Sequence, residues 1–275
     1  MSWRLSVQHR TSYKYEAPVV ASFNEVRMTP ASNGDQFLIH HGLYVSPHAH
    51  INRFRDYWGT DVETFDLQTP HETLEVVSDN LVEVSHPKVI DVGCTWSDLR
   101  NENIRDKYFE YTQHTQLANY VNASEISIEK RSPRDFVLLV SEYVNTQIAY
   151  VPGQTNVHTS ASQSFESKVG VCQDFTHVTL SVLRHFGIPA RYVSGYLFHG
   201  SQELGISSVG ESHSWVEAWV GDWMAIDPTN QRDVDESHIT VAKGRDYSDV
   251  SPLIGIYSGG ASREVSVEVT ITRQA

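Results

Sequence analysis

The sequence predicts an α+β protein, with an antiparallel β-sandwich-like part followed by helices packed on an antiparallel sheet. Three observations indicate this. Residues 1–88 contain only strand-like stretches, residues 131–187 contain two helix-like stretches, and strand-like stretches resume at residue 189. Strands and helices that are segregated along a chain, with no regular alternation, are typical of α+β folds.

The N-terminal part is predicted from hydrophobic alternation. The run WRLSVQHRTSYKY alternates, and NRFRDYWGTDVETFDL gives two extended runs around a Trp-Gly turn. The run TLEVVSDNLVEVS gives two further strands, separated by Ser78, Asp79 and Asn80. Short strands with turn residues between them, and without intervening helices, are typical of an antiparallel sandwich.

The sequence changes character after residue 88. Residues 89–130 are polar, rich in Asn and weakly periodic, which is typical of a connector with short helical turns. We therefore expect three units: an N-terminal β domain (1–88), a connector (89–130) and a second domain (131–275).

The second domain opens with two predicted helices. Ser132 and Pro133 form a helix start, with an N-cap residue followed by proline at the first helical position. The other helix covers 172–186, where apolar residues recur at helical spacing and Gly187 provides the stop. The runs PARYVSGYLF, SWVEAWV, WMAID and REVSVEVTIT are then predicted as strands.

Composition excludes several classes of function. The chain has 275 residues and a net charge of −13 without any basic run, which disfavours binding to nucleic acid or to an anionic membrane surface.

The longest apolar run, FVLLV at 136–140, is far too short to span a membrane, and the first ten residues lack a secretory apolar core. Two cysteines give no disulfide framework, so a cytoplasmic location is expected.

The fourteen histidines do not form a convincing metal motif. His40, His41, His48 and His50 cluster, but adjacent strand residues point to opposite faces, and no carboxylate or cysteine stands at ligand spacing there. We expect no metal.

Cys172 is the candidate nucleophile. It lies in the first turn of the predicted 172–186 helix, where unpaired N–H groups favour an anionic thiolate. Gly170 allows the tight approach that a nucleophile turn needs, and Asp174 suits the same end of the helix dipole. The alternative is a buried cysteine that acts as a small hydrophobic residue, as most free cysteines do. Cys94 has no helix behind it and is expected to be inert.

A thiolate nucleophile needs a base, and His213 is the candidate. It heads a strand in which Val216, Ala218 and Val220 alternate as a core-facing set, so His213 lies on the opposite face. Taken alone, such a histidine is more often structural or exposed.

Asp227 is the candidate that orients the imidazole, because it ends the next strand, immediately before Pro228. A strict two-residue loop at Gly221 and Asp222 would point Asp227 and His213 to opposite faces and would place Asn230 across from His213. An odd-length loop or a β-bulge would bring Asp227 to the correct face. Asn230 is the reserve, since Cys-His-Asn triads do the same work.

These residues resemble a known family. The segments GVCQDFTHVTLSVLRHFGIPARYVSGYL and HSWVEAWVGDWMAIDPTN are similar to the transglutaminase-like core of the papain-like thiol enzymes, and the closer likeness is to two-domain bacterial transglutaminase-like proteins with an N-terminal β domain. The likeness is strong over 150–255 and looser over 1–125.

The resemblance implies a nucleophile at Cys172, a base at His213 and an orienting residue at Asp227, within a catalytic domain at 131–275. It also implies that REVSVEVTIT joins the sheet bearing His213 and Asp227. Tyr150 and Gln154 are candidate substrate-positioning residues in the run YVPGQTNVHTS.

The expected activity is thioester-forming acyl transfer on peptide or amide bonds, without a cofactor. Hydrolysis is favoured, because nothing in the sequence suggests an extracellular substrate or a calcium-controlled gate. Transamidation of protein glutamine and a non-catalytic peptide-binding module are the alternatives. A peptide or protein is the expected substrate, and the N-terminal β domain is a candidate surface for a protein partner.

Overall fold

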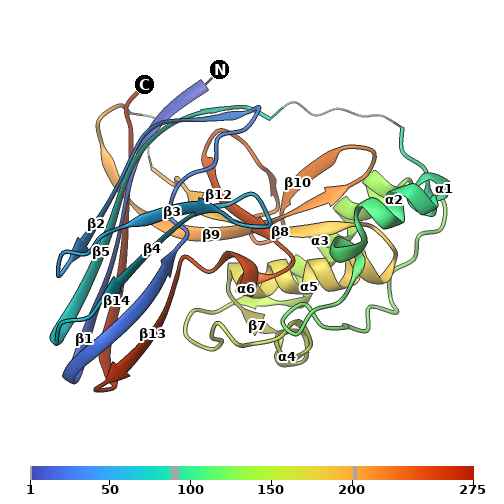
Figure 1. The fold of residues 1–275 in the computed structure, drawn as a ribbon. Helices are drawn as coiled ribbons and strands as arrows, with labels where there is room; N and C mark the ends of the chain where they lie inside the picture. Colours follow the sequence, from blue (N-terminus) through green and yellow to red (C-terminus); the bar gives the residue numbers. More distant parts are fainter. Residues whose placement is uncertain (1, 88–92, 201–202) are drawn as a thin grey trace.

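The computed structural model describes residues 2–87, 93–200 and 203–275. Within them, twelve strands belong to one antiparallel sheet, and β6 and β7 form a separate parallel pair. Figure 1 shows the long strands of the N-terminal part on one side of the molecule and most of the helices on the other. The α+β class that the sequence predicted is confirmed.

The N-terminal part contains five strands. They are β1 (Ser2–Val26), β2 (Gln36–Ser46), β3 (Asn52–Arg55), β4 (Asp61–Leu67) and β5 (His71–Ser85). β1 pairs with β5 along its first half and with β4 along its second half, so one long strand serves two sections of the sheet.

The prediction of two strands between residues 73 and 85 is wrong, because β5 runs unbroken through Ser78, Asp79 and Asn80. The side chains of Ser78 and Asn80 are buried. Both donate to the carbonyl oxygen of Met28, at 3.2 and 3.4 Å, and Asn80 also donates to Ser78 at 2.9 Å. Polar residues that usually signal a turn are thus satisfied inside a strand.

The segment between the two main parts holds three short helices. They are α1 (Trp96–Leu99), α2 (Glu102–Lys107) and the 3₁₀ helix η1 (Phe109–Thr112). Tyr108 packs against Trp219 and Trp223, with ring centroids 5.1 and 5.3 Å apart, so this segment lies against the second part. The boundaries at residues 88 and 130 stay a prediction.

The helices of the second part begin and end close to where the sequence places them. α3 (Pro133–Gln147) is capped by Ser132, whose side chain accepts from the Asp135 N–H, and α5 (Cys172–His185) is followed by Gly187 with φ 79°. α4 (Ala161–Ser167) was not predicted. Its capping box pairs Ser160 with Gln163, a signal that the sequence does contain.

The remaining strands complete the sheet. They are β8 (Ala190–Leu197), β9 (Ser207–Trp219), β10 (Trp223–Asp227), β11 (Arg232–Asp233), β12 (His238–Gly244), β13 (Leu253–Gly259) and β14 (Ser262–Arg273), with α6 (Tyr247–Val250) between β12 and β13. β9 lies between β8 and β10, and β12 pairs with the other edge of β8.

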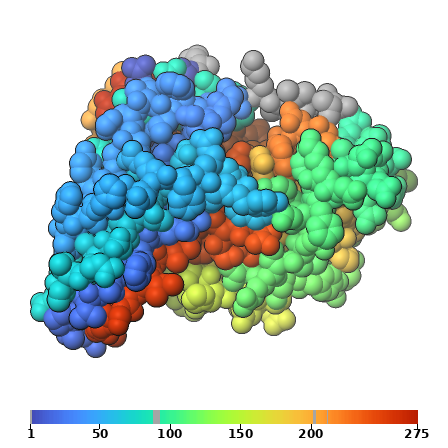
Figure 2. Space-filling view, viewed as in Figure 1, coloured from blue at the N-terminus to red at the C-terminus, as the bar shows by residue number. Residues whose placement is uncertain are grey.

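The C-terminal strand joins the two parts of the protein. β14 pairs with β9 over Val269–Thr272, as the resemblance implied, and with β1 over Leu5–Tyr15. In Figure 2 the red C-terminal residues accordingly lie among the blue N-terminal ones.

A shared core supports this arrangement. Its larger hydrophobic cluster takes Leu5 and Val82 from the N-terminal strands together with Phe136, Phe175 and Val216 from α3, α5 and β9. A second cluster, around Met28, Phe65 and Leu74, lies wholly within the N-terminal part. Among the described residues, none of the helices combines the length and hydrophobicity that a membrane crossing requires.

Close packing at Gly195 gives a test of the fold. A Cβ at Gly195 would lie 2.0 Å from the carbonyl oxygen of Ile239 and 2.7 Å from the Trp215 ring, whereas a Cβ at exposed Gly34 meets no atom within 4 Å. We expect Gly195→Ala to lower the free energy of unfolding by about 3 kcal/mol, because backbone cannot yield cheaply to overpacking. Gly34→Ala should change it by less than about 0.5 kcal/mol. Urea unfolding measures both, and equal effects would contradict the packing.

Candidate active site

The turn that carries Cys172 is built by its neighbours. β7 (Val169–Gly170) pairs with β6 (Ala149–Tyr150) and leads directly into α5 at Cys172. A Cβ on Gly170 would lie 2.6 Å from the Asp174 Cβ and 2.9 Å from the Ser164 Oγ, so only glycine fits here. The expected close approach at Gly170 is therefore confirmed.

Asp174 ties this turn to the preceding loop. Its Oδ2 accepts from the Val171 N–H at 2.8 Å and from the Thr155 Oγ1 at 2.7 Å. Burial raises the pKa of the Asp174 carboxyl, while these two hydrogen bonds act against the rise. The first turn of α5 is thus fixed by side-chain bonding as well as by helical hydrogen bonds.

The hairpin between β9 and β10 has a three-residue loop. Val220 N–H donates to the Asp222 carbonyl at 2.9 Å, and Gly221 adopts φ 98°, which favours glycine. Trp219 therefore pairs with Trp223, and Val216 pairs with Ile226. The loop has the odd length that His213 and Asp227 need in order to share a face.

His213 and Asp227 are in direct contact. His213 Nε2 lies 2.8 Å from Asp227 Oδ2, and both side chains are buried. Asn230 Nδ2 donates to the same oxygen at 2.7 Å and lies 3.4 Å from His213 Nε2. Asp227 is therefore the hydrogen-bond partner of the imidazole, and Asn230 supports the carboxylate.

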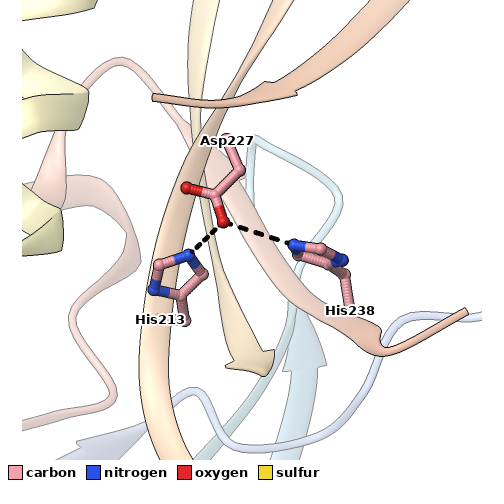
Figure 3. A group of neighbouring side chains, drawn as sticks. All are labelled: His213, Asp227 and His238. Carbon is pink, nitrogen blue, oxygen red and sulfur yellow. Dashed lines mark hydrogen bonds and ion pairs between the residues drawn. The ribbon is translucent and has the colours of Figure 1, made fainter. Parts of the chain in front are cut away.

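The sulfur of Cys172 interacts with His213 and helps to raise the pKa of its imidazole. Burial by itself would lower the pKa of His213. The hydrogen bonds that the ring makes with Asp227 and Cys172, together with the negative charges of these two groups, outweigh burial and raise the pKa to about 9. Because Nε2 faces Asp227, Nδ1 is the ring nitrogen left for the thiol, and Figure 3 shows it pointing away from the carboxylate. Cys172 is only partly buried.

The Asp227 carboxylate accepts many hydrogen bonds. Oδ1 accepts from the backbone N–H groups of Thr229 and Asn230, at 3.0 and 3.2 Å, in addition to the contacts at Oδ2. Burial acts to raise the pKa of Asp227, yet its hydrogen bonds to His213, His238 and Asn230 hold it far below its usual range. Asp227 therefore stays ionised across the pH range in which proteins are stable.

One site residue was missed by the sequence reasoning. His238, at the start of β12, places its Nε2 3.4 Å from Asp227 Oδ2, and Figure 3 shows the two histidines on either side of that carboxylate. No sequence spacing identifies His238, because it reaches β10 only through the pairing of β12 with β8 and of β8 with β9.

A metal ion is not needed to satisfy these groups. Among the described residues, the ligand atoms of His213, Asp227 and His238 lie within 4.8 Å of one another, so they are the set that could hold an ion. Each of the two ring nitrogens is already within hydrogen-bond distance of Asp227 Oδ2. Of the histidines noted at residues 40, 41, 48 and 50, His41 lies within hydrogen-bond distance of Asn80 and Glu63, at 2.6 and 2.8 Å.

Of the two candidate substrate-positioning residues, Tyr150 lies beside the nucleophile turn. Tyr150 is half exposed, pairs with Gly170 in the short parallel sheet, and its ring lies 6.4 Å from that of Phe175. Gln154 is exposed in the loop that follows. Their role in substrate binding stays a prediction.

Two family models match the chain. The bacterial transglutaminase-like N-terminal region matches residues 5–83, and the transglutaminase-like superfamily matches residues 121–228. The second segment contains Cys172, His213 and Asp227, whereas His238 lies beyond it. The fold and the family models place the chain in the transglutaminase-like superfamily, which is a family of thiol enzymes.

Sequence relatives extend over the whole chain. An uncharacterised protein of Mycobacterium leprae is 42% identical over 99% of this chain and 100% of its own length, and one of Mycobacterium bovis is 30% identical over 98% and 92%. A protein-glutamine gamma-glutamyltransferase of Pseudomonas aeruginosa is 35% identical over 24% of this chain and 11% of its own. The chain belongs to the bacterial transglutaminase-like family with the N-terminal β region.

A solved structure shares the complete fold. The crystal structure of a candidate cysteine protease from Cytophaga hutchinsonii superposes with a TM-score of 0.75, covers 100% of this chain and 98% of its own, and is 18% identical. The likeness shows that the β-rich part and the helical part occur together in the same arrangement in both proteins.

The raised pKa of His213 predicts a pH-dependent stability. A folded-state pKa of about 9, against an ordinary value of 6.5, adds stability that is complete below pH 6.5 and is lost as the pH rises through 9. His213→Asn should therefore cost up to about 3 kcal/mol more at pH 6 than at pH 9.5.

Urea unfolding at several pH values measures this difference, with His50→Asn at an exposed position as the control. A His213→Asn penalty that stays constant from pH 6 to 9.5 would refute the raised pKa.

Proposed function

We propose that this protein is a thiol-dependent acyl-transfer enzyme that acts on peptide or amide bonds, with hydrolysis as its favoured outcome. The observation that carries the proposal is the juxtaposition at one site of a partly buried cysteine, an imidazole with a raised pKa and a buried carboxylate. Membership of a thiol-enzyme family supports it independently.

The proposed reaction begins with the Cys172 thiolate. The sulfur attacks the amide carbonyl carbon and forms a tetrahedral intermediate, whose C–N bond then breaks to leave a thioester. His213 donates its Nδ1 proton to the departing amine. A histidine with a pKa of about 9 carries that proton at neutral pH, so it is ready to act as the general acid.

Deacylation reverses the role of the histidine. Neutral His213 accepts a proton from water while the water oxygen attacks the thioester carbonyl, and the C–S bond breaks to release the acid and the thiolate. Asp227 keeps the imidazole in the tautomer with its proton on Nε2 and stabilises the imidazolium. No external oxidant, reductant or cofactor is required for this balance.

The start of α5 supplies stabilisation for the oxyanion. The backbone N–H of Cys172 lies at the first position of the helix, where N–H groups have no helical partner. Such donors stabilise the negative charge that develops on the carbonyl oxygen of the intermediate. Tyr150 pairs in register with Gly170, which places its strand beside this turn and makes it our candidate for contact with substrate.

Transamidation is the second candidate, in which a primary amine replaces water in the second step. Its support is the segment shared with the gamma-glutamyltransferase of Pseudomonas aeruginosa. Hydrolysis needs no second organic substrate and therefore remains our first choice. A non-catalytic peptide-binding module is the third candidate, and it is disfavoured by the presence of a nucleophile, a base and an orienting carboxylate in contact.

The two cysteines provide a matched test of the nucleophile. Cys172→Ser should lower turnover of fluorogenic peptidyl amides by at least about 1,000-fold, because a serine hydroxyl is not ionised by this histidine. Cys94→Ser should leave turnover unchanged, since Cys94 donates to the Thr95 carbonyl, at 3.7 Å, in the segment before α1 and is not part of the site.

Full turnover by the Cys172→Ser variant would eliminate the thiol mechanism. Absence of turnover, together with iodoacetamide labelling of Cys172 no faster than that of Cys94 at pH 6, would favour the peptide-binding module.

Hydrolysis and transamidation differ in whether water or a primary amine attacks the thioester, so the ratio of the two products distinguishes them. With glutaminyl peptides and a labelled primary amine, we expect released acid and little incorporated label, because water resolves the thioester. Mass spectrometry of the products measures the ratio in one reaction. Label incorporated without released acid would establish transamidation and exclude hydrolysis.

A further inference from the structure

His238 is a buried histidine that contacts the proposed site but has no role in the proposed mechanism. Its side chain is fully buried, and its Nε2 lies 3.4 Å from the Asp227 oxygen that also faces His213. A buried polar side chain requires a hydrogen-bond partner, and this one shares its partner with the proposed catalytic base.

The surroundings of His238 fix its protonation at Nε2. The backbone N–H of Asp235 donates to Nδ1 at 3.2 Å, so Nδ1 carries a lone pair in the neutral ring and the proton is on Nε2. If the ring is doubly protonated, Nδ1 can donate to Asp235 Oδ1, also at 3.2 Å, and Nε2 keeps its proton. In both states an N–H group faces Asp227.

Packing fixes the orientation of the ring. Trp215, fully buried on β9, packs its ring at 77° to the His238 ring with 5.3 Å between centroids, and lies 6.1 Å from the His213 ring. His238 pairs with Leu197 on β8 in the strand register. The ring therefore packs against β9 while its Nε2 faces Asp227 on β10.

The site is the inner end of a connected series of ion pairs and hydrogen bonds. Asp235 contacts Arg232 on its outer side and His238 on its inner side, and Asp227 then joins His238 to His213. Hydrogen bonds from His238, Ser237 and Arg232 outweigh the burial of Asp235 and lower its pKa. The titratable groups facing His238 are thus Asp227 on β10, Asp235 in the preceding loop and His213 on β9.

We propose that His238 is a positioning residue for the reaction proposed above: it donates its Nε2–H to Asp227 and so divides the charge of that carboxylate between two imidazoles. A carboxylate that accepts hydrogen bonds from two imidazoles stabilises protonated His213 less than a carboxylate that accepts from His213 without His238. The base can then give up its proton to the leaving amine and recover it from water within one cycle. The inference rests on the proposed function.

Two substitutions separate the hydrogen bond from the packing. His238→Leu removes the donor, whereas the amide N–H of His238→Gln can restore it. In His238→Leu we expect the NMR titration midpoint of His213 to rise above that of the unaltered protein, because Oδ2 loses a competing donor. The kcat for a fluorogenic peptidyl amide should fall about 10-fold with KM unchanged, and His238→Gln should recover most of both effects.

A structural role alone would give a different result. If His238→Leu lowers only the melting temperature and leaves the His213 midpoint and kcat unchanged, the inference is wrong. It is also wrong if His238→Gln is as impaired as His238→Leu.

Histidine ¹⁵N NMR of the unaltered protein tests the proton position without any variant, so it decides the matter even if His238→Leu does not fold. We expect protonated Nε2 on His238, and an unprotonated Nε2 would overturn the proposal. Failure of the proposed function would appear separately, as full turnover by Cys172→Ser.

Discussion

The buried Asp227 carboxylate is the group on which the rest of the site depends. A charge taken out of water is costly unless hydrogen bonds and an opposite charge compensate it. Here the compensation comes from His213 on β9, His238 on β12 and the turn that follows β10. Three strands, β9, β10 and β12, must come together before the carboxylate is satisfied, so the site depends on formation of this part of the sheet.

The N-terminal part is joined to this assembly through backbone pairing as well as side-chain contact. β14 lies between β9 and β1, and buried His9 on β1 contacts the Tyr196 hydroxyl on β8 at 3.0 Å. Burial lowers the pKa of His9 to about 4, so the ring stays neutral in this contact at physiological pH. The N-terminal part is therefore joined to the strand of His213 by the backbone pairing of β14 with both β1 and β9.

Local signals predicted α3 and α5 well, but they missed α4 and divided the strand β5 in two. Ser132, Pro133 and Gly187 act through backbone groups within a few residues, so their effect is the same in the sequence and in the folded chain. Ser78 and Asn80 have the composition of a turn, but they bond to Met28, about fifty residues away in the chain. Long-range partners of polar side chains are invisible to a local pattern.

The sequence by itself determined the chemistry offered at the site: a cysteine at a helix start, a histidine on one strand and an aspartate ending the next, within a resemblance that the family models confirm. Tertiary structure decided which groups meet. The three-residue loop at Val220–Asp222 set the face on which Asp227 lies, because a change of one residue reverses every side chain of a strand. It also brought in His238, whose position depends on pairing across β8 and β9. The sequence specifies the residue types at the site, whereas the strand register and the contacts between these side chains are set only when the strands pair.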